Sequence, residues 1–308
     1  SEKVTGQIAL EAPAGWEVEP AAAPVELHGL ESETTCIFKI TPPKAGTGGE
    51  AKLRAMLVPP AGPRLQAFSR QRIEYPHIEP QTLITPAQAT MVRAPVENKA
   101  ARIGYLPGAG DAIAESLREI GAEVKLLEDQ DVNAATLSLF DAVVIGVRAS
   151  NAHPARVSAW FPELLAYAKK GGVVIMQYTT TPGPKPEHLP FPLKVSRDRV
   201  TDENAAVRLL AADHPILNFP NKITAADFAG WVQERGLYFP NEWSPAWTPI
   251  LSTNDPDEKP LDGGLLAARV EQGWFIYTGY SWFRQLPAGV PGAYRLFANM
   301  ISLGHSAP

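Results

Sequence analysis

The hydrophobic pattern of the chain changes its period near residue 101. Before that point, apolar and polar residues alternate in short runs such as "TTCIFKITPP" and "AKLRAMLVPP", which stop at prolines. After it, continuous apolar runs such as "DAVVIGV" and "VVIMQY" alternate with segments of helical period such as "AIAESLREIG". Period-two alternation predicts half-buried antiparallel strands, whereas apolar runs separated by helices are typical of a parallel sheet buried on both faces. The sequence therefore predicts an all-β domain followed by an α/β domain.

We place the boundary between these domains after residue 97, in a proline-rich connector. Residues 1–97 are predicted to form an immunoglobulin-like β-sandwich, and residues 98–308 an open, mostly parallel sheet with helices. The run "GGLLAARVEQGWFIYTGY" predicts a late antiparallel hairpin that turns near residues 272–273. A helix is predicted to begin at Pro162 in "PELLAYAKKGG" because proline suits a first helical position. Two domains also suit a length of 308 residues.

Composition argues against several classes of partner. The net charge of −5 and the absence of a basic cluster argue against a nucleic-acid partner. No apolar run is long enough to predict a membrane span. The single cysteine, Cys36, supports neither a disulfide framework nor a cysteine-based zinc site, and the six histidines are scattered. We therefore expect no metal site and no membrane partner.

The glycine-rich turn "GYLPGAGD" follows the first strand of the α/β domain. A dinucleotide-binding turn would have a third glycine at the position of Ile113. The sequence therefore predicts a tight turn that Asp111 caps, and no cofactor.

Polar and aromatic residues gather on the segments that follow the predicted strands. In open α/β sheets, ligands bind beyond the carboxyl ends of the strands, where these segments are expected to meet. The residues that we expect to bind a ligand are Arg148, Asn151, Gln177, Tyr178, Arg197, Trp231, Gln233 and Arg284. The alternative is that Arg–carboxylate pairs, with Glu234 and Arg235 among them, only hold irregular loops together.

Catalysis has no clear signature in this sequence. There is no Gly-x-Ser-x-Gly motif, and "MQYTTT" follows the fourth strand, where a hydrolase of this architecture would place its nucleophile. None of Gln177, Tyr178 and Thr179 is an activated nucleophile by itself. A second hypothesis is a hydrolase whose acid–base groups come from Asp198, Asp202 and Glu234, with an arginine stabilising the developing charge.

Several long segments resemble the C-terminal region of large bacterial PIG-L (LmbE-like) deacetylases. They are "IGYLPGAGD", "GVRASN", "PLKVSRDRVTDENA", "DHPILNFPNKITAADFAGWVQERGLYFPNEW" and "FRQLPAGVPGAYRLFANMISLG", together with "GQIALEAPAGWEVEP" and "IEYPHIEPQTL" nearer the N-terminus. The resemblance thus covers nearly the whole chain. It implies a β-sandwich followed by a domain like class I glutamine amidotransferases and ThuA-like proteins, which have a flavodoxin-like sheet.

The catalytic residues of neither relative can be carried over to this chain. The deacetylase family uses zinc and a His-Pro-Asp-Asp motif, but here Asp213-His214-Pro215 is followed by Ile216. The amidotransferase cysteine position falls near residues 177–178, and no cysteine stands there. Two further departures are Ser150, where an aromatic residue is usual in "RAxN", and Thr179, where asparagine is usual after "QY".

The resemblance implies a carbohydrate-associated accessory region of an N-acetyl sugar deacetylase. Its expected partners are a small sugar or glycan, and an upstream deacetylase catalytic domain. The expected location is the bacterial periplasm or the cell exterior, with the cytoplasm as the alternative; the sequence begins "SEKVTGQIAL", without a signal peptide. A third hypothesis is a purely structural scaffold that positions a partner or forms oligomers.

Overall fold

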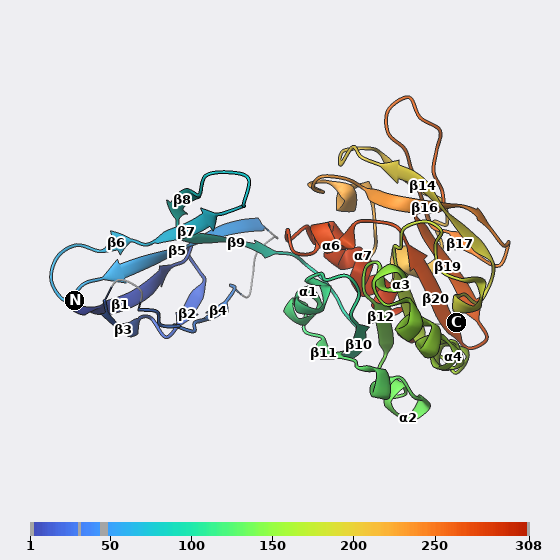
Figure 1. Cartoon of the computed structure of the whole chain (residues 1–308), viewed down its shortest axis with the longest axis horizontal. Coiled ribbons are helices and arrows are strands. Elements are labelled where there is room, and N and C mark those ends of the chain that lie inside the picture. The colour runs from blue at the N-terminus through green and yellow to red at the C-terminus, as the bar shows by residue number, and fades with distance from the viewer. Residues whose placement is uncertain (1–2, 30–31, 44–48, 307–308) are drawn as a thin grey trace. The chain divides into compact units, whose positions relative to one another are not determined.

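The structure is a computed structural model of the chain, and it describes residues 3–29, 32–43 and 49–306. The chain divides into two compact units, Ser1–Pro95 and Val96–Pro308 (Figure 1). The sequence-based boundary lies two residues further along the chain. Within the described ranges, no helix combines the length and the apolar character that crossing a membrane would need.

The first unit is all-β. Its largest sheet has five antiparallel strands in the order β3-β1-β5-β6, with β9 also paired to β5. Two further strand pairs, β2 with β4 and β7 with β8, complete the unit. The strands are β1 (Lys3–Glu11), β2 (Glu17–Glu19), β3 (Ala23–His28), β4 (Lys39–Thr41), β5 (Gly49–Val58), β6 (Leu65–Gln66), β7 (Phe68–Ile73), β8 (Gln81–Pro86) and β9 (Gln88–Arg93).

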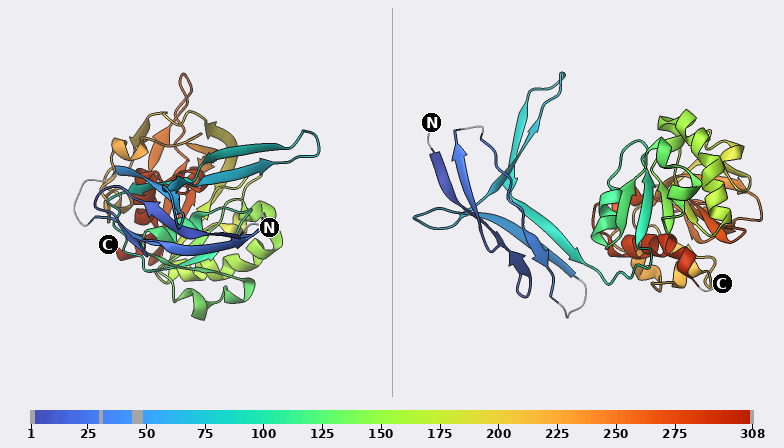
Figure 2. Two further views of the ribbon diagram at one scale, coloured as in Figure 1. Left: turned by 90° about the vertical axis from the view of Figure 1, so that its left-hand side faces the viewer. Right: turned by 90° about the horizontal axis from the view of Figure 1, so that it is seen from below.

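This unit buries little apolar surface. Of its described hydrophobic side chains only Ala9, Val25 and Leu53 are buried, and the β7–β8 hairpin stands away from the rest of the unit (Figure 2). The run "TTCIFKITPP", predicted as one strand, pairs only over Lys39–Thr41. The unit is therefore an all-β fold, while the closely packed two-sheet sandwich remains a prediction.

The second unit is built on a seven-stranded sheet in the order β11-β10-β12-β13-β20-β19-β17. The strands from β11 to β20 in that order run parallel, and β19 and β17 pair antiparallel at one edge. The strands are β10 (Arg102–Leu106), β11 (Glu123–Leu126), β12 (Ala142–Ile145), β13 (Val173–Gln177), β17 (Thr248–Pro249), β19 (Leu265–Val270) and β20 (Gly273–Thr278). The sheet is thus mixed and mostly parallel, and its late hairpin turns at Glu271–Gln272.

Helices cover both faces of this sheet. Alternate residues of β12 point to opposite faces, so Val144 packs with α1 and α7 while Val143 packs with α2 and α4. This two-sided burial explains why the strands read as continuous apolar runs. The helices are α1 (Ile113–Glu119), α2 (Ala134–Leu137), α3 (Ala149–Ala152), α4 (Pro154–Lys169), α5 (Pro215–Asn218), α6 (Trp282–Gln285) and α7 (Pro291–Ile301).

Helix α4 begins eight residues earlier than predicted. Pro154 takes the first helical position, and Pro162 lies inside the helix with an exposed side chain. An interior proline removes one backbone hydrogen bond and disfavours a helix. The buried stripe that contains Trp160, Phe161 and Leu164 packs on the sheet and holds the helix together across that position.

Two smaller strand pairs lie in the part of the chain between β13 and β19. Strand β14 (Leu193–Val200) pairs with β16 (Gly236–Trp243), and β15 (Val207–Leu209) pairs with β18 (Leu251–Thr253), both antiparallel. Strand β16 belongs to the segment "DFAGWVQERGLYFPNEW", so this segment lies partly in a ladder and partly in the loop before it.

Candidate functional site

The winding of the sheet reverses between β10 and β12, and ligands bind at such a point in open α/β sheets. Here the two loops beyond these strands press together, because a Cβ atom at Gly108 would lie 2.1 Å from the carbonyl oxygen of Val147. The carboxylate of Asp111 accepts hydrogen bonds from the Tyr105 hydroxyl (2.5 Å) and from the N–H groups of Ile113 (3.0 Å) and Val147 (3.2 Å). The chain itself therefore closes this crevice.

Gln177 belongs to the same closed network. Its side chain is 2% exposed, and its amide nitrogen donates to the carbonyl of Ile145 at 3.3 Å and to the Tyr105 hydroxyl at 3.5 Å. Burial, followed by the negative charge of Asp111, raises the pKa of Tyr105, so its hydroxyl stays protonated and donates to Asp111. Gln177, predicted to contact a ligand, instead packs beneath the loops.

An aromatic cluster lies next to this network. The ring of Tyr178 stacks on that of Tyr238, with centroids 6.1 Å apart and planes 4° apart, and meets the ring of Phe283 at 5.5 Å. The backbone carbonyl of Tyr178 accepts the N–H of Arg148 at 2.8 Å. Within the described part of the chain, neither the Tyr178 nor the Tyr238 hydroxyl has a hydrogen-bond partner. Tyr178 is 7% exposed and Tyr238 is partly buried, so the rings are largely covered while both phenol groups lack a protein partner in that part of the chain.

Backbone strain is concentrated around Tyr178. Five non-glycine residues of the described ranges have a left-handed backbone, and three of them are Arg148 (φ 54°), Gln233 (φ 67°) and Tyr238 (φ 54°). The other two, Asp257 and Glu271, lie in turns elsewhere. A left-handed backbone costs about 1–2 kcal/mol for a residue with a Cβ atom and tends to be retained at functional sites.

The carboxylate of Glu234 forms an ion pair with an arginine. Its Oε1 atom accepts hydrogen bonds from Arg284 Nε at 2.7 Å and from the Ser281 hydroxyl at 2.9 Å. The guanidinium of Arg284 also lies 4.9 Å from the centre of the Phe283 ring. This pair fastens the segment before β16 to the start of α6.

The three predicted catalytic carboxylates are not joined to one another. Asp198 lies in β14, where its N–H bonds the Ser196 hydroxyl, and the Asp202 side chain accepts the N–H of Asn204 at 2.8 Å. Among residues 3–29, 32–43 and 49–306, no hydrogen bond joins any two of Asp198, Asp202 and Glu234. No group of three or more His, Cys, Asp or Glu residues in those ranges is arranged to hold a metal ion.

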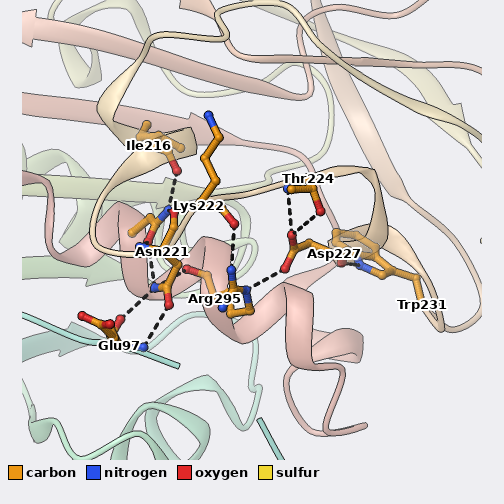
Figure 3. Close-up of polar contacts among 9 residues, drawn as sticks. Glu97, Ile216, Asn221, Lys222, Thr224, Asp227, Trp231 and Arg295 are labelled. Carbon is orange, nitrogen blue, oxygen red and sulfur yellow. Dashed lines mark hydrogen bonds and ion pairs between the residues drawn. The ribbon is translucent and has the colours of Figure 1, made fainter. Parts of the chain in front are cut away.

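Trp231 is a core residue and not the ligand-facing residue predicted. It is 3% exposed, packs against Phe228, Tyr280 and Trp282, and donates from its indole nitrogen to the Asp227 carbonyl at 3.2 Å. Figure 3 shows Asp227 next to Trp231, with its carboxylate bound to Thr224 and to Arg295 Nε, the latter at 2.7 Å. Phe228, Trp231 and Phe239 of this stretch therefore fill the interior.

The remaining predicted ligand residues divide into two groups. Asn151 has a local structural role, because its Oδ1 atom accepts from the Thr179 hydroxyl (2.6 Å) and from the Thr180 N–H (2.9 Å). Arg197 and Gln233 are exposed, and their side chains have no hydrogen bond or ion pair within the described ranges. The structure thus brings Arg148, Tyr178 and Arg284 together beyond the carboxyl end of β13.

Two residues that pack on Tyr178 are absent from the predicted ligand-binding residues. Tyr238 belongs to the polar and aromatic residues of the stretch 227–243 but is not predicted to bind a ligand, and Phe283 reads as an ordinary apolar position in "SWFRQL". Tyr238 stacks on Tyr178 from a left-handed backbone, and no local pattern predicts that conformation for tyrosine. We name the cluster formed by Arg148, Tyr178, Glu234, Tyr238, Phe283 and Arg284 the Tyr178 site.

The backbone strain at Arg148 has a direct test. Arg148→Gly is expected to be about 1 kcal/mol more stable than Arg148→Ala, because glycine adopts a φ of 54° without a Cβ clash. Urea unfolding of the two variants, which both lack the guanidinium group, measures the difference. Equal stabilities, or a more stable alanine variant, would contradict a left-handed backbone at this position.

Comparisons with known proteins give distant structural likenesses. No family model matches the chain, and no curated protein matches it. A cytoplasmic protein from Salmonella typhimurium (STM3548) is 14% identical over 77% of this chain and 95% of its own, with a TM-score of 0.43. A protein described as ThuA-like from Bacteroides uniformis is 11% identical over 68% of this chain and 93% of its own, with a TM-score of 0.40.

A beta-galactosidase from Rahnella sp. R3 is 11% identical over 70% of this chain, with a TM-score of 0.42, and this chain spans 32% of that enzyme's length. These likenesses indicate no activity for the present chain. The resemblance to PIG-L deacetylases therefore remains an expectation from the sequence.

Proposed function

We propose that the second unit is a non-catalytic binding domain whose Tyr178 site holds a sugar or a similar polyol. The observation that carries this proposal is the parallel stack of Tyr178 and Tyr238, whose hydroxyls have no partner among the described residues. Aromatic rings offer an apolar face, and phenol groups at their edge offer hydrogen bonds. Ligand sites commonly combine such aromatic walls with a few placed polar groups.

Two observations support binding without catalysis. A nucleophile needs an adjacent base or a lowered pKa, and Gln177 and Tyr178 occupy the position where related folds place one. Glu234, the carboxylate nearest to the aromatic cluster along the chain, is engaged by Arg284 and Ser281. We therefore assign the carboxylate a role in orienting Arg284, and propose no acid–base reaction.

The sequence resemblance extends this proposal to the biological setting. On that basis we propose that the chain is an accessory region of an exported bacterial PIG-L-type deacetylase, with the catalytic domain as its upstream partner. In this arrangement the Tyr178 site would retain the glycan while the zinc-dependent domain removes acetyl groups. Residues 1–308 contribute no deacetylase motif to that reaction.

Calorimetric titration tests the binding function. Chain 1–308 is expected to bind N-acetylglucosamine oligomers or related sugars, and Tyr238→Ala is expected to weaken binding about tenfold, because one ring of the stack is removed. Tyr75→Ala is the matched control, since Tyr75 is 57% exposed and lies in the first unit. The same sample is expected to release no acetate from these sugars.

Either of two outcomes would contradict the proposal. Acetate release by this chain would show that it is catalytic. Failure of every neutral and anionic sugar to bind would remove the binding function and leave the scaffold hypothesis.

A further inference from the structure

We infer that the Tyr178 site selects a sugar or polyol that carries an oxyanion, either a carboxylate or a phosphate, and that the guanidinium of Arg148 is its counter-charge. This inference rests on the proposed binding function and specifies its ligand. It concerns the charge of the ligand, which neither the aromatic stack nor the phenol groups can determine.

One arginine of the site has no charged partner among the residues that the structure describes. Arg284 and Glu234 form an ion pair of 2.7 Å, so these two charges compensate each other. Arg148 is exposed, and its guanidinium has no hydrogen bond or ion pair in residues 3–29, 32–43 and 49–306. One positive charge beside the stacked tyrosines is therefore uncompensated.

Arg148 is also held firmly in place at the backbone. Its N–H donates to the Tyr178 carbonyl at 2.8 Å, and its own carbonyl accepts from Asn151 at 3.0 Å and Ala152 at 2.9 Å. Its left-handed φ of 54° would suit glycine better than a residue with a Cβ atom. Strain of this kind persists where the surroundings or the function require it. We therefore infer that the Arg148 side chain has a function.

The chemistry of the neighbouring groups suits an oxyanion attached to a polyol. Arginine presents a planar fork of donors that matches carboxylate and phosphate oxygens. Burial raises the pKa of the Tyr178 hydroxyl, whereas the positive charge of Arg148 acts in the opposite direction, so the hydroxyl remains a donor at neutral pH. The anion would thus meet Arg148 and the hydroxyl of Tyr178, while the sugar ring meets the partly exposed rings of Tyr238 and Phe283.

Titrations with three matched probes at one ionic strength test this inference. Glucuronate and glucose 6-phosphate carry the oxyanion, and glucose lacks it. Wild-type chain is expected to bind at least one anionic probe about tenfold or more tightly than glucose, and Arg148→Gln is expected to abolish that preference. Arg148→Gly should do the same while accommodating the left-handed backbone, which separates loss of charge from loss of folding.

The control is Arg102→Gln, which also removes one positive charge. Arg102 begins β10, at the end of the sheet opposite to the Tyr178 site. It is expected to leave all three affinities unchanged. A preference for either anion that Arg148→Gln removes supports the inference and identifies the oxyanion. Equal binding of glucose and both anions, or a preference that survives in Arg148→Gln, overturns the inference and leaves the proposed function standing. Absence of binding for all three overturns the proposed function itself.

Discussion

Replacing Trp231 by alanine is expected to lower the free energy of unfolding of the second unit by about 3–5 kcal/mol. The indole is 3% exposed, contacts three other aromatic rings and has its N–H bonded to the Asp227 carbonyl. Alanine would leave a cavity and remove that hydrogen bond. Urea unfolding followed by near-ultraviolet circular dichroism measures the loss, because both units need not unfold together.

Trp231→Phe is the graded control for this experiment. It retains most of the ring volume and loses the indole donor, so its loss of stability should fall between those of wild type and Trp231→Ala. A change below about 1 kcal/mol in Trp231→Ala, together with weaker sugar binding, would instead restore the ligand-facing role that the sequence suggested.

Arg235→Met is expected to lower the free energy of unfolding by a similar amount, about 3–5 kcal/mol, because it leaves two buried carbonyls without their donors. Arg235 is 3% exposed. Its Nε and Nη2 atoms donate to the Ala205 carbonyl at 3.0 and 2.8 Å, and its Nη1 atom donates to the Phe228 carbonyl at 2.6 Å. Methionine fills part of the space and supplies no donor.

The matched control is Arg199→Met, on an exposed position of β14. Its effect on the free energy of unfolding should stay within about 0.5 kcal/mol, as for other exposed positions. If Arg235→Met proved as mild as this control, Arg235 could not be what holds residues 205 and 228 to the start of β16.

Trp231 and Arg235 illustrate how far local sequence carries the prediction of a site. "DFAGWVQERGLYFPNEW" mixes aromatic and charged residues without a clear period, which predicts a loop with Trp231 and Gln233 facing a ligand and Arg235 holding the loop. In the structure Arg235 does hold the loop, and Gln233 is exposed. Trp231 is buried because Tyr280 and Trp282, some fifty residues later in the chain, pack against it.

The elements of the α/β unit were more accessible to sequence reasoning than its site. Residues 142–145 and 173–176 are runs of consecutive apolar residues, which are typical of a strand buried on both faces. The helix predicted to begin at Pro162 begins at Pro154. Both prolines suit a first helical position, so the local sequence does not distinguish them. Packing on the sheet decides between them.

The sequence by itself determines the change of hydrophobic period near residue 101 and the apolar runs. It also determines the scattered histidines and the lack of a nucleophile after the fourth strand. They follow from which residues neighbour one another along the chain. The partners of Glu234, the closed network around Gln177 and the ring of Tyr238 over Tyr178 depend on segments that meet only after folding. A backbone dihedral such as that of Arg148 is set by those contacts against the preference of the residue itself.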